Sequence, residues 1–196
     1  MAYPETLEIL ITHLKKLPGV GRKTAERYAF ALLDMPESEC NLFGNQIASF
    51  HASLASCEVC GALKEKTCQY CTDLNRSHTL CIVATKRDIF PIEETRSFKG
   101  FYHVLGTLIS PLEGKMPSAI NLTRLREQIA SQKTSEIIIA LESTLEGDAT
   151  AFYLKEALED LNIPTYRLAL GMPIGSSLEY VDEGTLASAL AYKQRI

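Results

Sequence analysis

Residues 57–71 read CEVCGALKEKTCQYC, which places two Cys-x-x-Cys pairs either side of a seven-residue spacer. The four sulfurs of these pairs can surround one Zn²⁺ ion tetrahedrally at about 2.3 Å. Because four thiolates leave no open coordination position, such an ion would hold structure and would not activate water. Two disulfides or free thiols are the alternatives, but nothing else in the sequence indicates a secreted protein. The spacing predicts one structural zinc ion per chain, bound by Cys57, Cys60, Cys68 and Cys71.

The whole-chain composition is that of an ordinary folded protein. With 196 residues, 46% of them hydrophobic, the chain is long enough for one domain or two small ones. It has no apolar run that could span a bilayer and no signal-peptide pattern, so we expect a soluble, cytoplasmic protein. The net charge of −4 is too mild to exclude nucleic acid as a partner, and the local distribution of charge decides that question.

The segment before the cysteines has the pattern of a helical hairpin. Apolar residues recur at helical spacing over residues 7–14 and again over 25–32, which predicts two amphipathic helices. Between them, residues 17–21 read LPGVG. The proline ends the first helix, the glycines allow a sharp turn, and Val20 can pack between the helices. These features form a helix–hairpin–helix signature. The helical spacing of apolar residues over residues 43–54 predicts a third helix.

The start of the second predicted helix suits a phosphate group, because free backbone N–H groups there form an anion site. Five basic residues and one acid, Glu26, lie between Lys15 and Arg27, a local charge of 5 − 1 = +4. Such a hairpin holds a DNA backbone without reading its sequence. A helical hairpin with a solvated basic face is the alternative. The predicted DNA-binding residues are Gly19, Val20, Gly21, Arg22, Lys23 and Arg27.

After the cysteines the pattern changes to alternating strands and helices. Apolar runs predict strands at residues 80–84, 101–105, 137–141 and 164–170. Helices are predicted at 86–94, where Pro91 interrupts the pattern, and at 122–129, 147–161 and 185–192. This alternation is typical of an α/β domain with a mostly parallel sheet covered by helices on both faces.

Taken together, these stretches resemble the RecR family of bacterial recombination mediator proteins. The match includes LPGVG at 17–21, the four cysteines, and KGFYHVL at 99–105. It continues with SPLEG at 110–114, TLEGDATA at 144–151, and GMPIG at 171–175 before LEY. The resemblance implies a helix–hairpin–helix domain at 1–56, a C4 zinc finger at 57–71, a Toprim domain at 79–174 and a helical tail at 175–196.

The Toprim resemblance also bears on catalysis. Catalytic Toprim domains hold Mg²⁺ with a Glu after the first strand and an Asp-x-Asp after a later one. Here the first of these positions is Ala84, and the other two are Glu142 and Thr144. We therefore expect no catalytic residues, and we assign Glu142, Glu146 and Asp148 to contact with a partner protein. Acids in a first helical turn also favour the helix dipole, which is a purely structural alternative for Glu146 and Asp148.

The resemblance implies a non-catalytic DNA-binding scaffold in repair by homologous recombination. Such proteins act with RecO and often RecF to load RecA recombinase at gaps, and they assemble as dimers or tetrameric rings. The implied partners are single- and double-stranded DNA, RecO, RecF and further copies of the chain, with the protein nucleoid-associated at repair sites. A Mg²⁺-dependent Toprim nuclease or topoisomerase-like enzyme is the alternative, and a zinc-ribbon interaction module without DNA affinity is a third.

Overall fold

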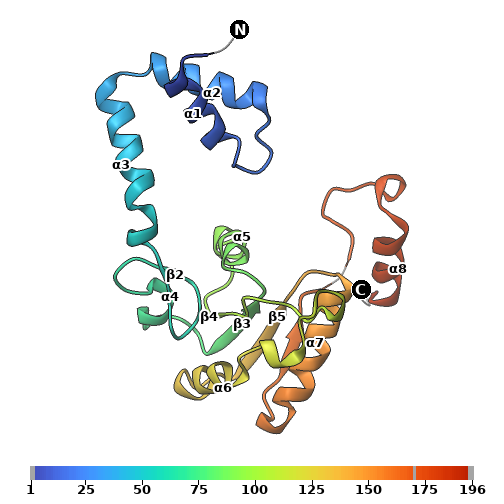
Figure 1. The fold of residues 1–196 in the computed structure, drawn as a ribbon. Coiled ribbons are helices and arrows are strands. Elements are labelled where there is room, and N and C mark those ends of the chain that lie inside the picture. The colour runs from blue at the N-terminus through green and yellow to red at the C-terminus, as the bar shows by residue number, and fades with distance from the viewer. Residues whose placement is uncertain (1–2, 170, 194–196) are drawn as a thin grey trace. The chain divides into compact units, whose positions relative to one another are not determined.

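A computed structural model of the chain describes residues 3–169 and 171–193 (Figure 1). The chain divides into two compact units, Met1–Leu54 and Ala55–Ile196. None of the helices in the described residues has the length and apolar character that a membrane span requires.

The first unit is entirely helical. It contains α1 (Glu5–Leu14), α2 (Arg22–Asp34) and α3 (Glu37–Ser53). Ile11 of α1 and two alanines of α2, Ala25 and Ala29, form its small buried core. The alanines let the two helices approach closely, and Val20 from the connecting turn packs against the same core, as predicted. The predicted amphipathic pair is therefore confirmed.

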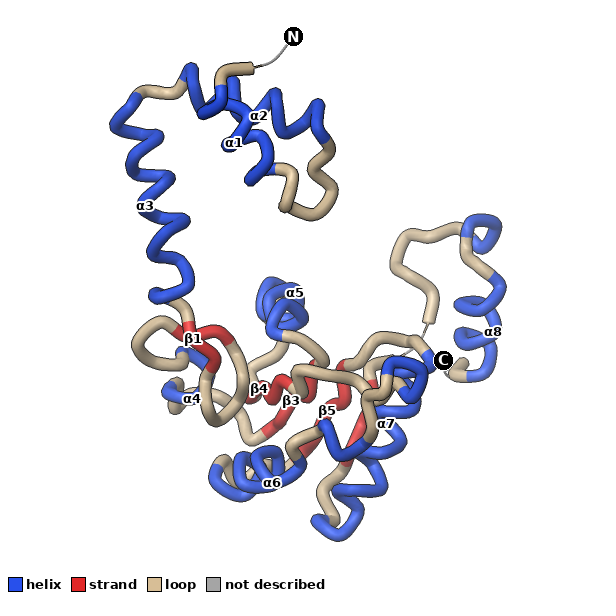
Figure 2. The backbone as a smooth tube through the Cα atoms, viewed as in Figure 1, coloured by secondary structure: helices blue, strands red, loops and turns tan. Residues whose placement is uncertain are grey.

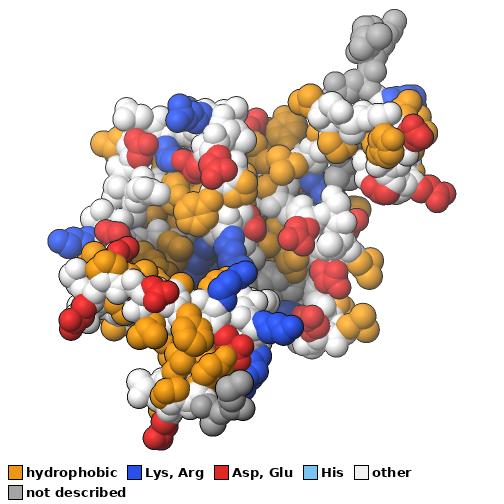
Figure 3. All heavy atoms as spheres, turned by 90° about the horizontal axis from the view of Figure 1, so that it is seen from above, with side chains coloured by type: hydrophobic (Ala, Val, Ile, Leu, Met, Phe, Trp, Pro, Cys, Tyr) orange, Lys and Arg blue, Asp and Glu red, His pale blue; other side chains and the backbone are white. Residues whose placement is uncertain are grey.

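Helix α3 differs from the first two helices in having no buried residue. Its large apolar side chains Leu42, Phe43, Ile47 and Phe50 are exposed. Other exposed apolar side chains lie elsewhere in the described chain, and the surface seen in Figure 3 mixes apolar groups with charged ones. The apolar spacing over residues 43–54 thus predicted the helix correctly, but these side chains do not enter a core.

The second unit is built on a four-stranded sheet of order β4-β3-β5-β6 in which all neighbouring strands are parallel. Figure 2 shows the strands of this sheet in red, with helices around them. Its strands are β3 (Thr79–Val83), β4 (Phe101–Val104), β5 (Glu136–Ala140) and β6 (Thr165–Arg167). In the central register, Val83 of β3 lies opposite Val104 on one side and Ala140 on the other. The predicted parallel sheet is confirmed.

Alternate residues of the central strands point to opposite faces of the sheet and pack into two separate hydrophobic cores. Leu80 and Ile82 of β3 pack with residues of α6 (Leu122–Ser131) and α7 (Leu145–Leu158). Cys81 and Val83, which point to the other face, pack with α5 (Ile89–Glu94) and with the four-cysteine segment. That segment consists of β1 (Ala55–Ser56), β2 (Leu63–Lys64) and α4 (Gln69–Thr72). The cysteine cluster is therefore part of the sheet's second core.

Two predicted elements differ in detail from the observed ones. Pro91 does not interrupt α5, because it lies in the first helical turn, where a backbone N–H has no partner within the helix. The last strand ends at Arg167, although the Leu168 N–H still donates to the Ile139 carbonyl at 3.4 Å. Residue 170, which the prediction placed in this strand, lies outside the described residues.

Short 3₁₀ helices and a C-terminal helix complete the described chain. The 3₁₀ segments are Lys86–Asp88, Pro111–Glu113, Pro117–Ala119, Glu159–Leu161 and Leu178–Tyr180. Helix α8 (Glu183–Ala191) begins after Asp182, whose carboxylate accepts the Thr185 N–H at 2.9 Å. This cap satisfies one of the free donors at the start of the helix.

His103 of β4 is buried in a polar network beneath α6. The Gln128 amide donates to the Tyr102 carbonyl at 2.8 Å, so its oxygen is turned toward His103. The His103 Nδ1–H then donates to that oxygen at 2.7 Å, which identifies the neutral ring with its proton on Nδ1. Burial disfavours the charged ring and lowers the pKa of His103 from 6.5 to about 4.

This buried histidine predicts acid sensitivity of the fold. Between pH 6.5 and about 4 the unfolded chain takes up a proton at His103 that the folded chain does not, so stability is complete above this window and falls as the pH drops through it. The loss amounts to about 3 kcal/mol. His103→Asn keeps the donor to Gln128 without the titration. We expect urea unfolding to show a smaller loss between pH 7 and 4 in this variant, and an equal loss would contradict the assignment.

Candidate functional site

The four predicted zinc ligands come together in the structure. Their sulfur atoms all lie within 4.8 Å of one another. Cys57 and Cys71 are 3.9 Å apart between sulfurs, and Cys60 and Cys68 are 3.5 Å apart. A tetrahedral ion with bonds of about 2.3 Å requires sulfur–sulfur edges of about 3.8 Å, close to these separations. All six cysteines of the chain are free, so the disulfide alternative is not what the structure shows.

A tight knuckle positions the first two ligands. The Gly61 N–H donates to the Cys57 carbonyl and the Cys57 N–H donates to the Ala62 carbonyl, both at 2.8 Å. Gly61 adopts a φ of +79°, and a Cβ there would lie 3.0 Å from the Cβ of Val104. Glycine is thus needed both for the turn and for the close approach to β4. The Val104 N–H, in turn, donates to the Cys60 carbonyl at 2.7 Å.

The negative charge of four clustered thiolates would need a bound cation to balance it. Hydrogen bonds from neighbouring groups, first the Cys71 thiol, lower the pKa of Cys60 to about 5. Its hydrogen bond to Cys60 raises the pKa of Cys71, and burial raises the pKa of Cys68 to about 11. Four thiolates packed this closely require a positive ion to balance their charge. The donor set and its spacing fit a divalent metal ion that prefers sulfur ligands.

The hairpin places its backbone as predicted. Gly19 has a φ of +76°, in the region that favours glycine, and Gly21 precedes the first residue of α2. Because Gly21 has no side chain to cap the helix, the N–H groups of the first turn stay available to an anion.

The three cations predicted to bind DNA differ in their surroundings. The Arg22 guanidinium pairs with Glu8 of α1 at 3.1 Å and with Glu26 at 2.9 Å. These carboxylates raise the pKa of Arg22 and occupy its donors. Lys23 and Arg27 are exposed, and the Arg27 guanidinium lies 5.6 Å from the centre of the Tyr28 ring. The i,i+4 spacing could have predicted the Arg22–Glu26 pair, but no local pattern predicts the pair with Glu8.

A hollow of about 350 Å³ lies where the central strands end, the usual location of a ligand site in a parallel sheet. Glu142, Thr144 and Glu146 line it together with Ala84, so the strand-end positions of the Toprim comparison do converge. The other residues that line it are Thr85, Gly106, Thr107, Leu108, Ser110, Glu113 and Lys115. Asp148 is not among them: its carboxylate binds the Arg167 guanidinium of β6 at 2.5 Å.

The start of α7 fixes this side of the hollow. The Thr144 hydroxyl accepts the Gly147 N–H at 3.1 Å and caps the helix. A Cβ at Gly147 would lie only 2.0 Å from the Glu142 carbonyl oxygen, so the chain can double back here only with glycine. Glu142 and Glu146 are therefore presented from one strand-to-helix turn.

Among the described residues that line the hollow, none at the end of β3 is acidic, since Ala84 and Thr85 stand there. Asp88, the next acid along the chain, accepts the Thr85 N–H at 2.6 Å and the Thr85 hydroxyl at 2.8 Å. It caps the helix that follows β3 and does not line the hollow. Glu113 pairs with Lys115 at 2.6 Å.

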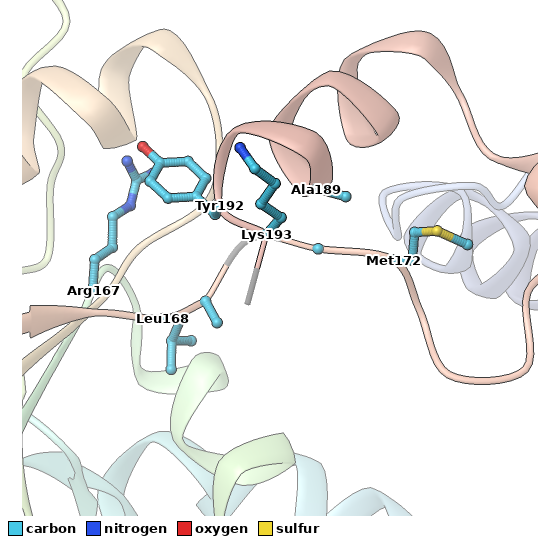
Figure 4. A pocket seen from close by; sticks show the side chains of 8 residues that line it. Arg167, Leu168, Met172, Ala189, Tyr192 and Lys193 are labelled. Atoms are coloured by element: carbon cyan, nitrogen blue, oxygen red, sulfur yellow. The ribbon is translucent and has the colours of Figure 1, made fainter. Parts of the chain in front are cut away.

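A second and larger hollow, of about 810 Å³, lies between the end of β6 and α8 (Figure 4). Arg167, Met172, Tyr192 and Lys193 contribute side chains to it. None of the residues predicted to form a site lines it, although Arg167 carries the pair with Asp148.

Comparison with known proteins agrees with this arrangement. Family models match at residues 7–50 (RecR, helix-hairpin-helix), 78–169 (Toprim domain) and 171–194 (RecR, C-terminal). The Recombination protein RecR of Protochlamydia amoebophila is 46% identical over 197 residues and covers 100% of both chains. Those of Chlamydia caviae and Chlamydia abortus are 46% and 44% identical over 194 residues, covering 97% of both chains.

The hairpin, the four-cysteine cluster and the Toprim sheet together define a Toprim protein with an N-terminal helix–hairpin–helix, which confirms the predicted fold class. The full-length matches are specific enough to name the group. The chain belongs to the RecR family of recombination proteins, and this membership supports a role in recombination repair.

Proposed function

We propose that this chain is a non-enzymatic DNA-binding scaffold in repair by homologous recombination, acting with RecO and RecF to load RecA recombinase at gaps. The observation that carries the proposal is the contrast between two sites. The hairpin offers free backbone donors and two exposed cations, Lys23 and Arg27. The sheet-end hollow has Ala84 where a metal-binding enzyme needs a carboxylate.

One hairpin is a weak DNA ligand, since it contacts few phosphates. Several hairpins on one homo-oligomer bind the same strand with a high effective concentration, which multiplies the affinity without new contacts. Assembly as a dimer or a tetrameric ring also accounts for DNA binding by a chain of net charge −4, because only the +4 hairpin segments need to face the phosphates.

The four-cysteine cluster has a structural role in this proposal, with Cys57, Cys60, Cys68 and Cys71 holding one Zn²⁺ per chain. When bound, the ion neutralises the thiolates and ties the knuckle to α4. The knuckle is joined to the sheet by the hydrogen bond that the Val104 N–H donates to the Cys60 carbonyl.

We assign the sheet-end hollow to a partner protein, most simply RecO, with Glu142 and Glu146 as its charged contacts. Asp148 belongs to the same assignment by sequence, but its carboxylate is engaged with Arg167 and reaches a partner only if that pair opens. The alternative function, a Mg²⁺-dependent Toprim nuclease or topoisomerase, would use the same carboxylates.

The zinc assignment predicts a stoichiometry and a loss of stability. Protein purified without chelator should contain one zinc per chain by elemental analysis. Cys68→Ser should lose the zinc and unfold at lower temperature, because the cluster forms part of the second core of the sheet. Cys40→Ser, outside the cluster on α3, is the matched control and should keep the metal. Zinc-free wild-type protein, or unchanged thermal stability in Cys68→Ser, would contradict the assignment.

The DNA assignment predicts a change in salt dependence. Replacing both Lys23 and Arg27 with Ala should weaken binding equally on all sequences and reduce the slope of log affinity against log salt by up to about 2. Lys66→Ala with Arg87→Ala removes the same charge from two exposed residues of the other unit and should leave the slope unchanged. Equal slopes for wild type and the hairpin variant would place the phosphate contacts elsewhere.

Experiments on the sheet-end hollow distinguish the scaffold function from the enzyme function. We expect no nicking of supercoiled plasmid with Mg²⁺ or Mn²⁺, because β3 ends in Ala84 instead of a carboxylate and Glu113, the acid from the segment after β4, is paired with Lys115. Glu146→Lys should abolish RecO binding in a pull-down while leaving the fold and DNA affinity intact. Glu156→Lys, an exposed acid of the same helix that does not line the hollow, is the control. Metal-dependent nicking that disappears in Glu146→Ala would contradict the scaffold function and support the Toprim enzyme instead.

A further inference from the structure

We propose that Tyr28 is a base-stacking residue that makes this chain bind single-stranded DNA more tightly than duplex DNA of the same length. The inference rests on the proposed function, in that it requires the hairpin to bind DNA, and it adds a strand preference to that site. A base-stacking residue is part of neither the proposed phosphate site nor the descriptions of the matched families.

The position of Tyr28 is the first step. It lies on α2, the helix whose N-terminus and side chains form the proposed phosphate site. Tyr28 follows Arg27 directly, and the Arg27 guanidinium lies 5.6 Å from the centre of its ring. A nucleotide whose phosphate is held by Arg27 therefore has its base within reach of the ring.

The surroundings of the ring are the second step. Tyr28 is 41% exposed, and the Arg27 guanidinium, a flat cation, already lies over it at 5.6 Å. The guanidinium lies within cation–π distance, so this face of the ring is open to a group of that size from the solvent side. Arg27 is itself exposed, so it can move to a phosphate and leave the ring face to the base. The neighbouring exposed aromatic of α2, Phe30, is different because it packs edge-on against Tyr3 at 5.9 Å.

The strand preference follows from stacking. A ring on the protein surface stacks with any base of a single strand, whatever its identity. In duplex DNA the bases are already stacked and paired, and taking one out costs several kcal/mol. The phosphate contacts of Lys23 and Arg27 are available from both forms of DNA, so the stacking contribution of Tyr28 is specific to the single strand.

The test compares three probes on the full-length protein: an oligo(dT) strand, an abasic strand with the same number of phosphates, and a duplex. Tyr28→Leu, which keeps an apolar side chain without a π face, should bind oligo(dT) about 5- to 100-fold more weakly. It should bind the abasic strand and the duplex as the wild type does, with an unchanged salt slope. Tyr28→Phe should keep the wild-type affinities, because stacking does not need the hydroxyl.

The outcomes distinguish this inference from the function on which it rests. Equal affinity of the wild type for oligo(dT) and the abasic strand, with DNA binding intact, overturns stacking and leaves the DNA function standing. Equal losses on all three probes in Tyr28→Leu show a general contact and also overturn it. Wild-type protein that binds none of the probes overturns the proposed function together with the inference. Tyr166→Leu, an exposed tyrosine on β6, controls for loss of a surface ring.

Discussion

The hydrogen bond from the Val104 N–H to the Cys60 carbonyl joins the cysteine knuckle to the edge strand of the sheet. Strand β4 is the edge of the sheet, and an unpaired edge is open to solvent and to other chains. The cysteine knuckle covers that edge at its carboxyl end and brings Cys57, Cys60 and Cys68 into the core formed by Cys81, Val83 and Tyr102. The knuckle has few apolar side chains of its own, so its geometry depends on whatever holds the four sulfurs together. The structure of the cysteine cluster and the covering of the β4 edge therefore depend on each other.

The sequence was sufficient for features that are encoded locally. The short apolar run 137–141 is rich in β-branched residues and forms the predicted buried strand, and the cysteine spacing needs only short turns to converge. The glycines of residues 17–21 are likewise read from the chain itself. Contacts between distant segments were not predictable: the pairs Arg22–Glu8 and Arg167–Asp148, and the packing of the cysteine cluster on the sheet. Each depends on how far two elements approach, which no residue pattern within either element specifies.

The Arg22 pairs also change how the basic hairpin should be understood. Of the three α2 cations in the +4 segment, one is already bound by carboxylates from both helices, so it joins α1 to α2 and holds the turn between them. A guanidinium with two carboxylate partners is a poor phosphate ligand unless a partner is displaced, whereas Lys23 and Arg27 carry no such cost. Charge counting alone treats the three as equivalent. The structure divides them into one residue that shapes the hairpin and two that can contact a ligand.

The loss of one carboxylate has very different consequences for a metal ion and for a protein cation in the sheet-end hollow. Mg²⁺ needs several oxygens in a near-octahedral set, but β3 ends in Ala84, and Glu113 from the segment after β4 is paired with Lys115. An arginine or lysine needs only one or two carboxylates, and a single turn can present both, as Glu142 and Glu146 are presented beside Gly147. Among the residues that line the hollow, three glutamates and one lysine leave a charge of 1 − 3 = −2. The substitution that disfavours a metal thus leaves an acidic recess that a basic side chain of a protein partner can still neutralise.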